Sequence, residues 1–248
     1  MRKSFGRVGV ALAASLLGVL VPAVPAHATG RLAGFIVGID PGHNGRNYTD
    51  PSFLSKQVWN GREWEDCDTT GTQTNGGYAE HAFNWVVANY LAQKLRAAGA
   101  TVVWTRSSDT GIGPCVDQRA RLLNHDHANI SIDIHADGGP SSGRGFAILL
   151  PVADGPNDRV IKSSVRFGGY LRSRMIGMAG MPVSTYDGTN GLAYRNDLAG
   201  LNLTTETKVL IECGNMRNST DAKLLISKTW QLKAADAMAS AITKMLVG

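Results

Sequence analysis

The chain has 248 residues, with 25 lysines and arginines, 20 aspartates and glutamates, and a formal net charge of +5 at neutral pH. Three of the basic residues and none of the acidic ones lie within residues 1–28, so residues 29–248 carry 22 against 20, a net +2. This balance gives no reason to expect a nucleic-acid partner. The remaining 220 residues are enough for one domain with a substantial core.

The first 28 residues have the three-part layout of a secretory signal peptide. Residues 2–7 carry the basic charges, residues 8–24 form an uncharged apolar run, and Ala26-His27-Ala28 fits a small-x-small cleavage site. The run is shorter than the roughly 20 apolar residues of a membrane-spanning helix. We therefore expect cleavage after Ala28, no stable membrane span in the mature chain 29–248, and a secreted, periplasmic or cell-wall location.

Segments typical of strands alternate with segments typical of helices. Short apolar runs predict strands at residues 35–40, 101–105, 130–134, 146–150 and 208–211. Helical periodicity and boundary residues predict helices at 79–98, 116–125, 158–178 and 220–246. The alternation indicates a single α/β domain whose central sheet is mostly parallel or mixed, with helices on both faces. Residues 44–77 are rich in Asn, Asp, Thr and Gly, and we expect a long functional loop there.

Residue types common in hydrolases follow three of the predicted strands. His43 comes after the first strand, His135 after the third and Glu212 after the last, while Glu80 opens the first long helix. In an α/β sheet the carboxyl ends of parallel strands form one binding edge. Two histidines and a carboxylate make an open zinc site, and a second carboxylate can serve as the base. Each side chain also has a structural interpretation: loop hydrogen bonds, helix-terminus charge for Glu80, or a buried polar network for Glu212.

Five features, taken together, resemble the zinc-dependent N-acetylmuramoyl-L-alanine amidases of the third amidase type. They are IVGIDPGHNG (36–45), Glu80 at a helix start, TRSSD (105–109), SIDIHADG (131–138) and VLIECGNMRN (209–218). They occur in the family's order and span nearly the whole mature chain. Residues 213 and 215 depart from the family's usual types, and the 45–77 insertion, with Trp59 and Trp64, has no role that the resemblance supplies.

The resemblance implies the chemistry of the site. His43, Glu80 and His135 would bind one Zn²⁺ per chain, and Glu212 would be the catalytic carboxylate. The implied reaction is hydrolysis of the amide between N-acetylmuramic acid and L-alanine in peptidoglycan or muropeptide fragments. Zinc would polarise the carbonyl and acidify the water, and Glu212 would carry the proton to the departing amine. Nearby acceptors must orient both histidines, and Asp40, Asp133 and Asp137 are the candidates in the sequence.

The three cysteines contain no CxxC pair, which argues against a cysteine zinc site or a thioredoxin-like motif. Cys67 and Cys115 lie in polar, loop-like sequence, whereas Cys213 ends a β-run, where buried free cysteines are common. In an oxidising compartment two cysteines can pair. We expect a Cys67–Cys115 disulfide.

Contacts with the substrate are predicted from residue type alone. Arg106 and Arg119 could meet carboxylates of the anionic stem peptide, although structural salt bridges are the alternative for both. Asn196, before the last strand, could hydrogen-bond the peptide backbone. We expect His81, His125 and His127 not to be ligands, and the protein to be a monomer.

Two other functions use similar residues. A zinc carboxypeptidase shares the His-Glu-His set but needs a cationic pocket for a terminal carboxylate, and no compelling arginine pair provides one. A catalytically inactive wall-binding or regulatory protein would be expected to lack one of the four residues. A serine hydrolase is disfavoured because GxSxG is absent, and a cysteine peptidase built on Cys213 has no evident histidine partner.

Overall fold

A six-stranded mixed sheet forms the centre of the molecule in the computed structural model, which describes residues 1, 3 and 30–248. In sheet order the strands are β4 (Thr101–Trp104), β1 (Ile36–Pro41), β5 (Ile130–Asp137), β8 (Thr207–Asn215), β6 (Ala147–Pro151) and β7 (Leu192–Arg195). The first four are parallel, and β6 and β7 run antiparallel to β8. The predicted α/β fold is confirmed; the expected signal peptide falls almost entirely outside the described residues.

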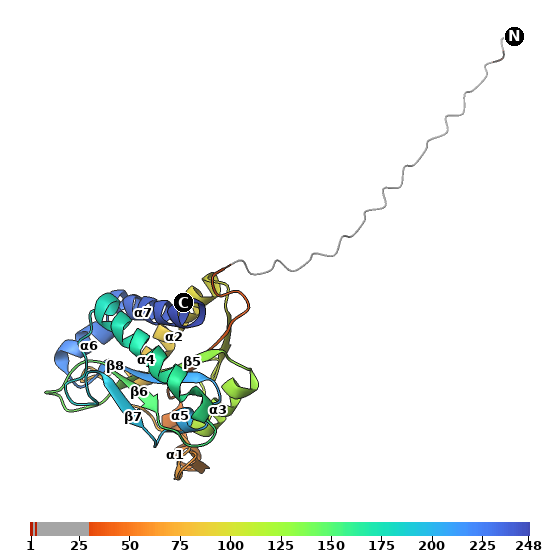
Figure 1. The fold of residues 1–248 in the computed structure, drawn as a ribbon. Helices are drawn as coiled ribbons and strands as arrows, with labels where there is room; N and C mark the ends of the chain where they lie inside the picture. Colours follow the sequence, from red (N-terminus) through yellow and green to blue (C-terminus); the bar gives the residue numbers. More distant parts are fainter. Residues whose placement is uncertain (2, 4–29) are drawn as a thin grey trace.

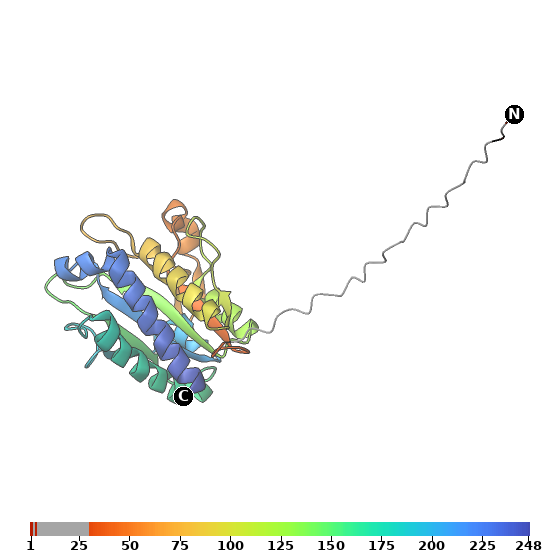
Figure 2. The same cartoon turned by 90° about the horizontal axis from the view of Figure 1, so that it is seen from above.

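Three long helices cover one face of this sheet (Figures 1 and 2). They are α2 (Glu80–Ala97), α4 (Ile161–Arg174), which continues into the π-helical turn η3 (Met175–Ala179), and α7 (Lys228–Val247). Their apolar side chains pack on alternate strand residues such as Val37, Ile132 and Ile211 to form the main core. The short helices α3 (Val116–His125) and α5 (Ala199–Asn202) lie on the other face (Figure 1).

The two faces of the sheet differ in chemistry because successive side chains in a strand point to opposite sides. The residues between the core positions include Asp40, Asp133 and Glu212. Asp40 and Asp133 line a cavity together with residues of α3 and α5. A small apolar cluster that includes Leu149 and Leu201 covers the rest of that face. The polar residues therefore lie on the face with fewer helices.

Several predicted boundaries need correction. Strands β5 and β8 are longer than expected, so His135 and Glu212 belong to strands instead of following them. The closing helix is two helices, α6 (Ser219–Leu225) and α7, because the Ser227 hydroxyl caps α7 by accepting the Trp230 N–H at 3.4 Å. Strand β7 was not predicted; it is only four residues long.

The long loop expected at 44–77 contains short elements. These are η1 (Asn47–Thr49), α1 (Pro51–Leu54) and a hairpin of β2 (Gln57–Trp59) and β3 (Trp64–Asp66). Asn60-Gly61, a typical hairpin-turn pair, was the signal for this hairpin. Gly61 has φ 106°, which favours glycine, and the buried Asn60 side chain accepts the N–H groups of Arg62 and Glu63 at 2.9 Å.

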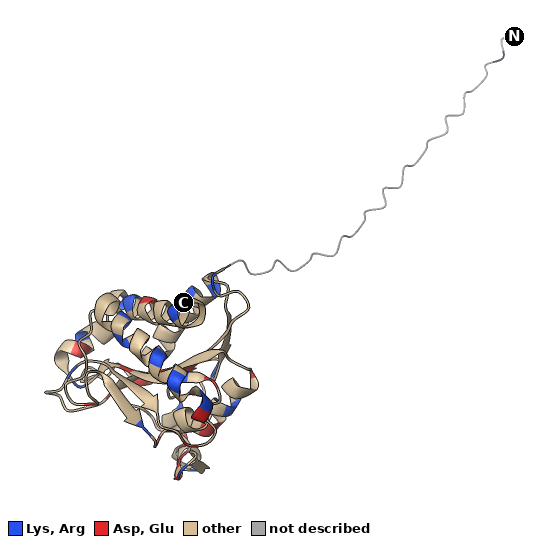
Figure 3. Cartoon of the chain, viewed as in Figure 1, with Lys and Arg blue, Asp and Glu red and all other residues tan. Residues whose placement is uncertain are grey.

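Basic residues gather on the helical face. Helix α4 carries two lysine or arginine pairs, Lys162 with Arg166 and Arg172 with Arg174, and no acidic residue (Figure 3). A short 3₁₀ helix, η2 (Asp158–Val160), precedes it.

Among the described residues, no helix combines the length and apolar character needed to cross a membrane.

Candidate metal centre

The site begins with two neighbouring strands. His135 of β5 and Glu212 of β8 are register partners, so their side chains leave adjacent backbones on the same face of the sheet. After β1, the Gly42 N–H donates to the Ile134 carbonyl at 3.0 Å, which brings the next residue, His43, to the same edge. The His43 and His135 rings meet edge to face, with centroids 4.9 Å apart.

Glu80 lies between the two imidazoles. It is the first residue of α2 and is 4% exposed. Its Oε1 is 2.9 Å from His135 Nδ1, its Oε2 is 3.3 Å from His43 Nε2, and Oε2 also accepts the Thr72 N–H at 2.9 Å. Burial alone would raise the pKa of Glu80, but the two histidines more than offset this effect and hold it well below its usual value.

These three residues fit a metal ion. One ligand atom from each of His43, Glu80 and His135 lies within 4.8 Å of the others. Two imidazoles and a carboxylate are a donor set that zinc accepts readily, with a fourth position left for water or substrate. Burial would lower the pKa of His43, but the carboxylates of Glu80 and Asp68 raise it to about 10. These two buried carboxylates give the site a negative charge, which suits a cation.

His43 is held by contacts on both its backbone and its ring. Its φ of 59° lies in the left-handed region, which costs a non-glycine residue about 1 kcal/mol or more. Arg119 Nη2 donates to the His43 carbonyl at 2.9 Å, and Nδ1 of the ring lies 3.2 Å from Asp68 Oδ1. With Nδ1 facing Asp68, Nε2 faces Glu80 and the centre of the site.

Glu212 stands at this centre without a partner for one of its oxygens. Its Oε2 is buried and has no hydrogen bond among the described residues. Burial raises the pKa of Glu212 well above its usual value, and the nearby carboxylates of Glu80 and Asp137 raise it further. A buried carboxyl group with an unsatisfied oxygen and a raised pKa is typical of a proton carrier in an active site.

A cavity of about 210 Å³ opens beside the histidines on the polar face of the sheet. Its lining includes His43, His135 and Thr69 together with the apolar residues Val116 and Leu198. The site therefore has access to space that could hold part of a ligand.

Comparison with known proteins assigns the family. A family model described as N-acetylmuramoyl-L-alanine amidase matches residues 37–244. The chain belongs to the N-acetylmuramoyl-L-alanine amidases. It is 39% identical over 244 residues to the N-acetylmuramoyl-L-alanine amidase Rv3717 of Mycobacterium tuberculosis, an alignment that covers 93% of this chain and 97% of that protein.

Solved structures agree with this assignment. The N-acetylmuramyl-L-alanine amidase Ami1 from Mycobacterium smegmatis is 40% identical with a TM-score of 0.81, over 87% of this chain and 98% of that one. The catalytic domain of CwlV from Bacillus (Paenibacillus) polymyxa var. colistinus shares the fold at 22% identity and a TM-score of 0.64, over 86% and 98% of the two chains. The family assignment sets aside the carboxypeptidase, serine-hydrolase and cysteine-peptidase alternatives.

The two arginines predicted to contact substrate are both buried and make contacts inside the protein. The Arg106 side chain is 1% exposed, and its guanidinium donates to backbone carbonyls that include Pro41 at 2.8 Å and His81 at 3.0 Å. These internal partners favour the structural alternative for Arg106 over a contact with substrate. Arg119 is likewise buried and pairs with Asp40 at 2.8 Å. The structural alternative holds for both.

Asn196 is exposed in the segment after β7. Ala147 of β6 is the partner of Glu212, while Pro151 at the other end of β6 pairs with Arg195. The register thus places Asn196 toward the far end of the sheet, and the structure does not bring it together with the four candidate residues.

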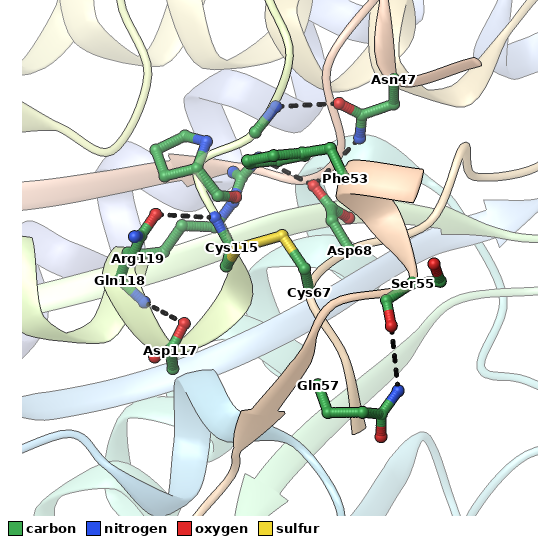
Figure 4. Close-up of a disulfide and its surroundings, with 12 residues drawn as sticks. Asn47, Phe53, Ser55, Gln57, Cys67, Asp68, Cys115, Asp117, Gln118 and Arg119 are labelled. Carbon is green, nitrogen blue, oxygen red and sulfur yellow. Dashed lines mark hydrogen bonds and ion pairs between the residues drawn. A yellow bond between two sulfur atoms is a disulfide. The ribbon is translucent and has the colours of Figure 1, made fainter. Parts of the chain in front are cut away.

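Sequence analysis missed both acceptors that lie 3.2 Å from His43 Nδ1, the Asp68 carboxylate and the Thr69 carbonyl. Of the expected candidates, Asp40 pairs with Arg119 and Asp133 pairs with the buried Lys208 at 2.9 Å. Asp68 faces the ring instead. The signal for Asp68 was its position directly after Cys67, whose predicted disulfide to Cys115 the structure confirms (Figure 4). Cys213 is buried and unpaired, as expected.

Proposed function

We propose that this amidase is exported and uses one Zn²⁺, held by His43, Glu80 and His135, to hydrolyse the bond between N-acetylmuramic acid and L-alanine. Peptidoglycan or its soluble fragments are the substrate, and Glu212 is the catalytic carboxylate. The observation that carries this proposal is the convergence of three donor atoms within 4.8 Å, with Glu212 directly opposite His135 in the sheet.

When bound, zinc supplies Lewis acidity, which polarises the scissile carbonyl and makes water easier to deprotonate. Glu212 takes the proton from the attacking water. Because burial and neighbouring carboxylates raise its pKa, the carboxyl group can hold this proton and then donate it to the leaving nitrogen. Asp68 and the neighbouring Thr69 carbonyl keep Nδ1 of His43 occupied, so that Nε2 stays directed into the site.

Export rests on two features of the chain. Residues 1–28 have the layout of a signal peptide, and a disulfide joins Cys67 to Cys115. Disulfides persist in oxidising compartments and are rare in the cytosol. The mature enzyme would therefore act in the periplasm, in the cell wall or outside the cell.

The first test is product analysis. Purified enzyme is incubated with a muropeptide, with a zinc chelator, and with chelator followed by excess zinc, and the products are identified by mass spectrometry. We expect separate sugar and L-alanyl-peptide masses, lost with chelator and restored by zinc. Release of a single terminal amino acid, or cleavage unaffected by a chelator that demonstrably strips the metal, would contradict the proposal.

The second test separates metal binding from proton transfer. We expect Glu212→Gln to retain zinc and to lose at least about 100-fold in kcat, because an amide cannot accept and donate the proton. His43→Ala should instead lose bound zinc, measured by elemental analysis of the dialysed protein. Near-native turnover by Glu212→Gln, or equal zinc content in His43→Ala and the parent, would overturn the respective role.

A further inference from the structure

Asp68 connects the disulfide with the candidate metal ligand His43. Figure 4 shows the disulfide with Asp68 and Arg119 beside it. Cys67 is bonded to Cys115, and the next residue, Asp68, is 5% exposed. Asp68 Oδ1 lies 3.2 Å from His43 Nδ1 and also accepts the Thr69 N–H at 2.7 Å. Its Oδ2 accepts from Asn47 Nδ2 at 3.0 Å. The carboxylate that contacts the His43 ring therefore belongs to the residue directly after a cross-linked cysteine.

Arg119 fixes the same carboxylate from the other side of the cross-link. It belongs to α3, which begins directly after Cys115, and its Nη2 is 3.3 Å from Asp68 Oδ2. The same nitrogen donates to the His43 carbonyl at 2.9 Å, and Nη1 donates to the Pro41 carbonyl at 2.9 Å. One planar guanidinium thus holds both the end of β1 and the carboxylate that faces the ring.

The disulfide is the covalent part of the attachment between the segment after β3 and the start of α3. Two polar contacts accompany it: the Val116 N–H donates to the Cys67 carbonyl at 2.8 Å, and Arg119 Nη2 lies 3.3 Å from Asp68 Oδ2. Beyond Cys67 the chain has no helix or strand until α2 begins at Glu80. An exposed carboxylate in such a segment would adopt several rotamers, whereas here it is buried with four polar neighbours.

We infer that Asp68 is a positioning residue for His43, and that the Cys67–Cys115 disulfide holds Asp68 in place, so that metal affinity depends on the disulfide. This inference rests on the proposed function only in taking His43 as a metal ligand. The pairing that forms in an oxidising compartment then does more than stabilise the fold: it completes the orientation of a ligand on which the metal site depends.

The test measures zinc affinity of the metal-free protein by competition with a chromophoric chelator. Three variants are compared with the parent: Asp68→Asn, the double variant Cys67→Ala/Cys115→Ala, and the matched control Asp66→Asn. Asp66 flanks Cys67 on the other side and is exposed. We expect Asp68→Asn to weaken zinc binding by roughly 10–100-fold, the usual effect of losing a partner of a ligating histidine. The double variant should weaken it by about tenfold or more, and Asp66→Asn should leave it unchanged.

Far-UV circular dichroism and thermal unfolding of each metal-free variant show whether it is folded at the temperature of the assay. Asp68→Asn keeps the disulfide, so it tests the positioning role even if the double variant fails to fold. A parent protein that binds no zinc would contradict the proposed metal site itself. A parent that binds zinc, together with folded variants of equal affinity, would overturn the inference and leave the proposed function intact.

Discussion

Gly42 contributes to the site by having no side chain. A Cβ at this position would overlap the His135 imidazole, with Cε1 and Nε2 as its nearest atoms. We expect Gly42→Ala to push the ring out of line and to weaken zinc binding at least about tenfold. The same chelator competition measures this change. Gly76→Ala is the control, because the nearest atom to its added Cβ is Thr74 Oγ1 at 3.8 Å, and equal losses in both variants would contradict the explanation.

Cys213 adjoins the catalytic candidate Glu212 but points into the main core. Burial raises the pKa of its thiol well above the usual value, and the carboxylates of Glu212 and Glu80 raise it further. A thiol reacts as its thiolate, so Cys213 should be inert in the folded protein. We expect a thiol reagent to count no thiols in the native oxidised protein, one after denaturation and three after denaturation with reduction. Rapid labelling of native protein would show that the core opens there.

At the level of single residues, the sequence predicted those site residues whose role follows from their position relative to the strands and helices. His43, His135 and Glu212 could be selected because each comes at or near a strand end, and parallel strands bring such residues to one edge. The roles of Arg106 and Asp68 depend on burial, which is a property of the folded molecule. Arg106 has a structural role because its guanidinium donates to the buried carbonyls of Pro41 and Gly42 at the end of β1.

Helix α4 offers a matched pair of adjacent glycines. A Cβ at Gly168 would lie 2.5 Å from Leu150 Cδ2 of the sheet, whereas a Cβ at Gly169 would meet nothing within 4 Å. Alanine is favoured over glycine inside a helix by up to about 1 kcal/mol. We therefore expect Gly169→Ala to raise the free energy of unfolding by roughly 0.5–1 kcal/mol and Gly168→Ala to lower it by about 1–3 kcal/mol. Urea unfolding measures both, and similar effects of the two substitutions would contradict the packing argument.

The elements that sequence analysis predicted well are long or strongly patterned. Helix α3 has the expected bounds, and α2 differs by one residue at each end. Strand β7 and the hairpin were missed because three- or four-residue strands contain too few residues to show alternation. The break before α7 was missed because apolar periodicity continues across Ser227, and only the cap reveals a new helix start.

At the scale of the whole molecule, alternation of strands and helices predicted the layers but not the order of the strands. The order β4-β1-β5-β8-β6-β7 decides which ends meet, and it arises from contacts between residues far apart in the chain. This order places β5 and β8 side by side, with His135 opposite Glu212. The site is thus a property of the sheet as a whole, although each of its residues could be found in a local motif.

The disulfide and bound zinc should make coupled contributions to the free energy of unfolding of the whole molecule. The disulfide closes a loop of 48 residues, so the chain-entropy model gives it roughly 4 kcal/mol of stability. Zinc that binds only the folded state adds about 4.1 kcal/mol when its free concentration is 1,000 times the dissociation constant. If losing the disulfide weakens zinc binding tenfold, the contribution of zinc at that concentration falls to about 2.7 kcal/mol.

A thermodynamic cycle measures this linkage. Denaturant unfolding is followed for the parent and for Cys67→Ala/Cys115→Ala, each with and without zinc at one buffered free concentration. Because Asp68 connects the disulfide to His43, we expect zinc to stabilise the double variant by about 1.4 kcal/mol less than the parent. Asp68→Asn should show at least this deficit, because it is expected to weaken zinc binding tenfold or more, while retaining the disulfide's own contribution. Strict additivity of zinc and disulfide would mean that the cross-link stabilises the fold without reaching the metal site.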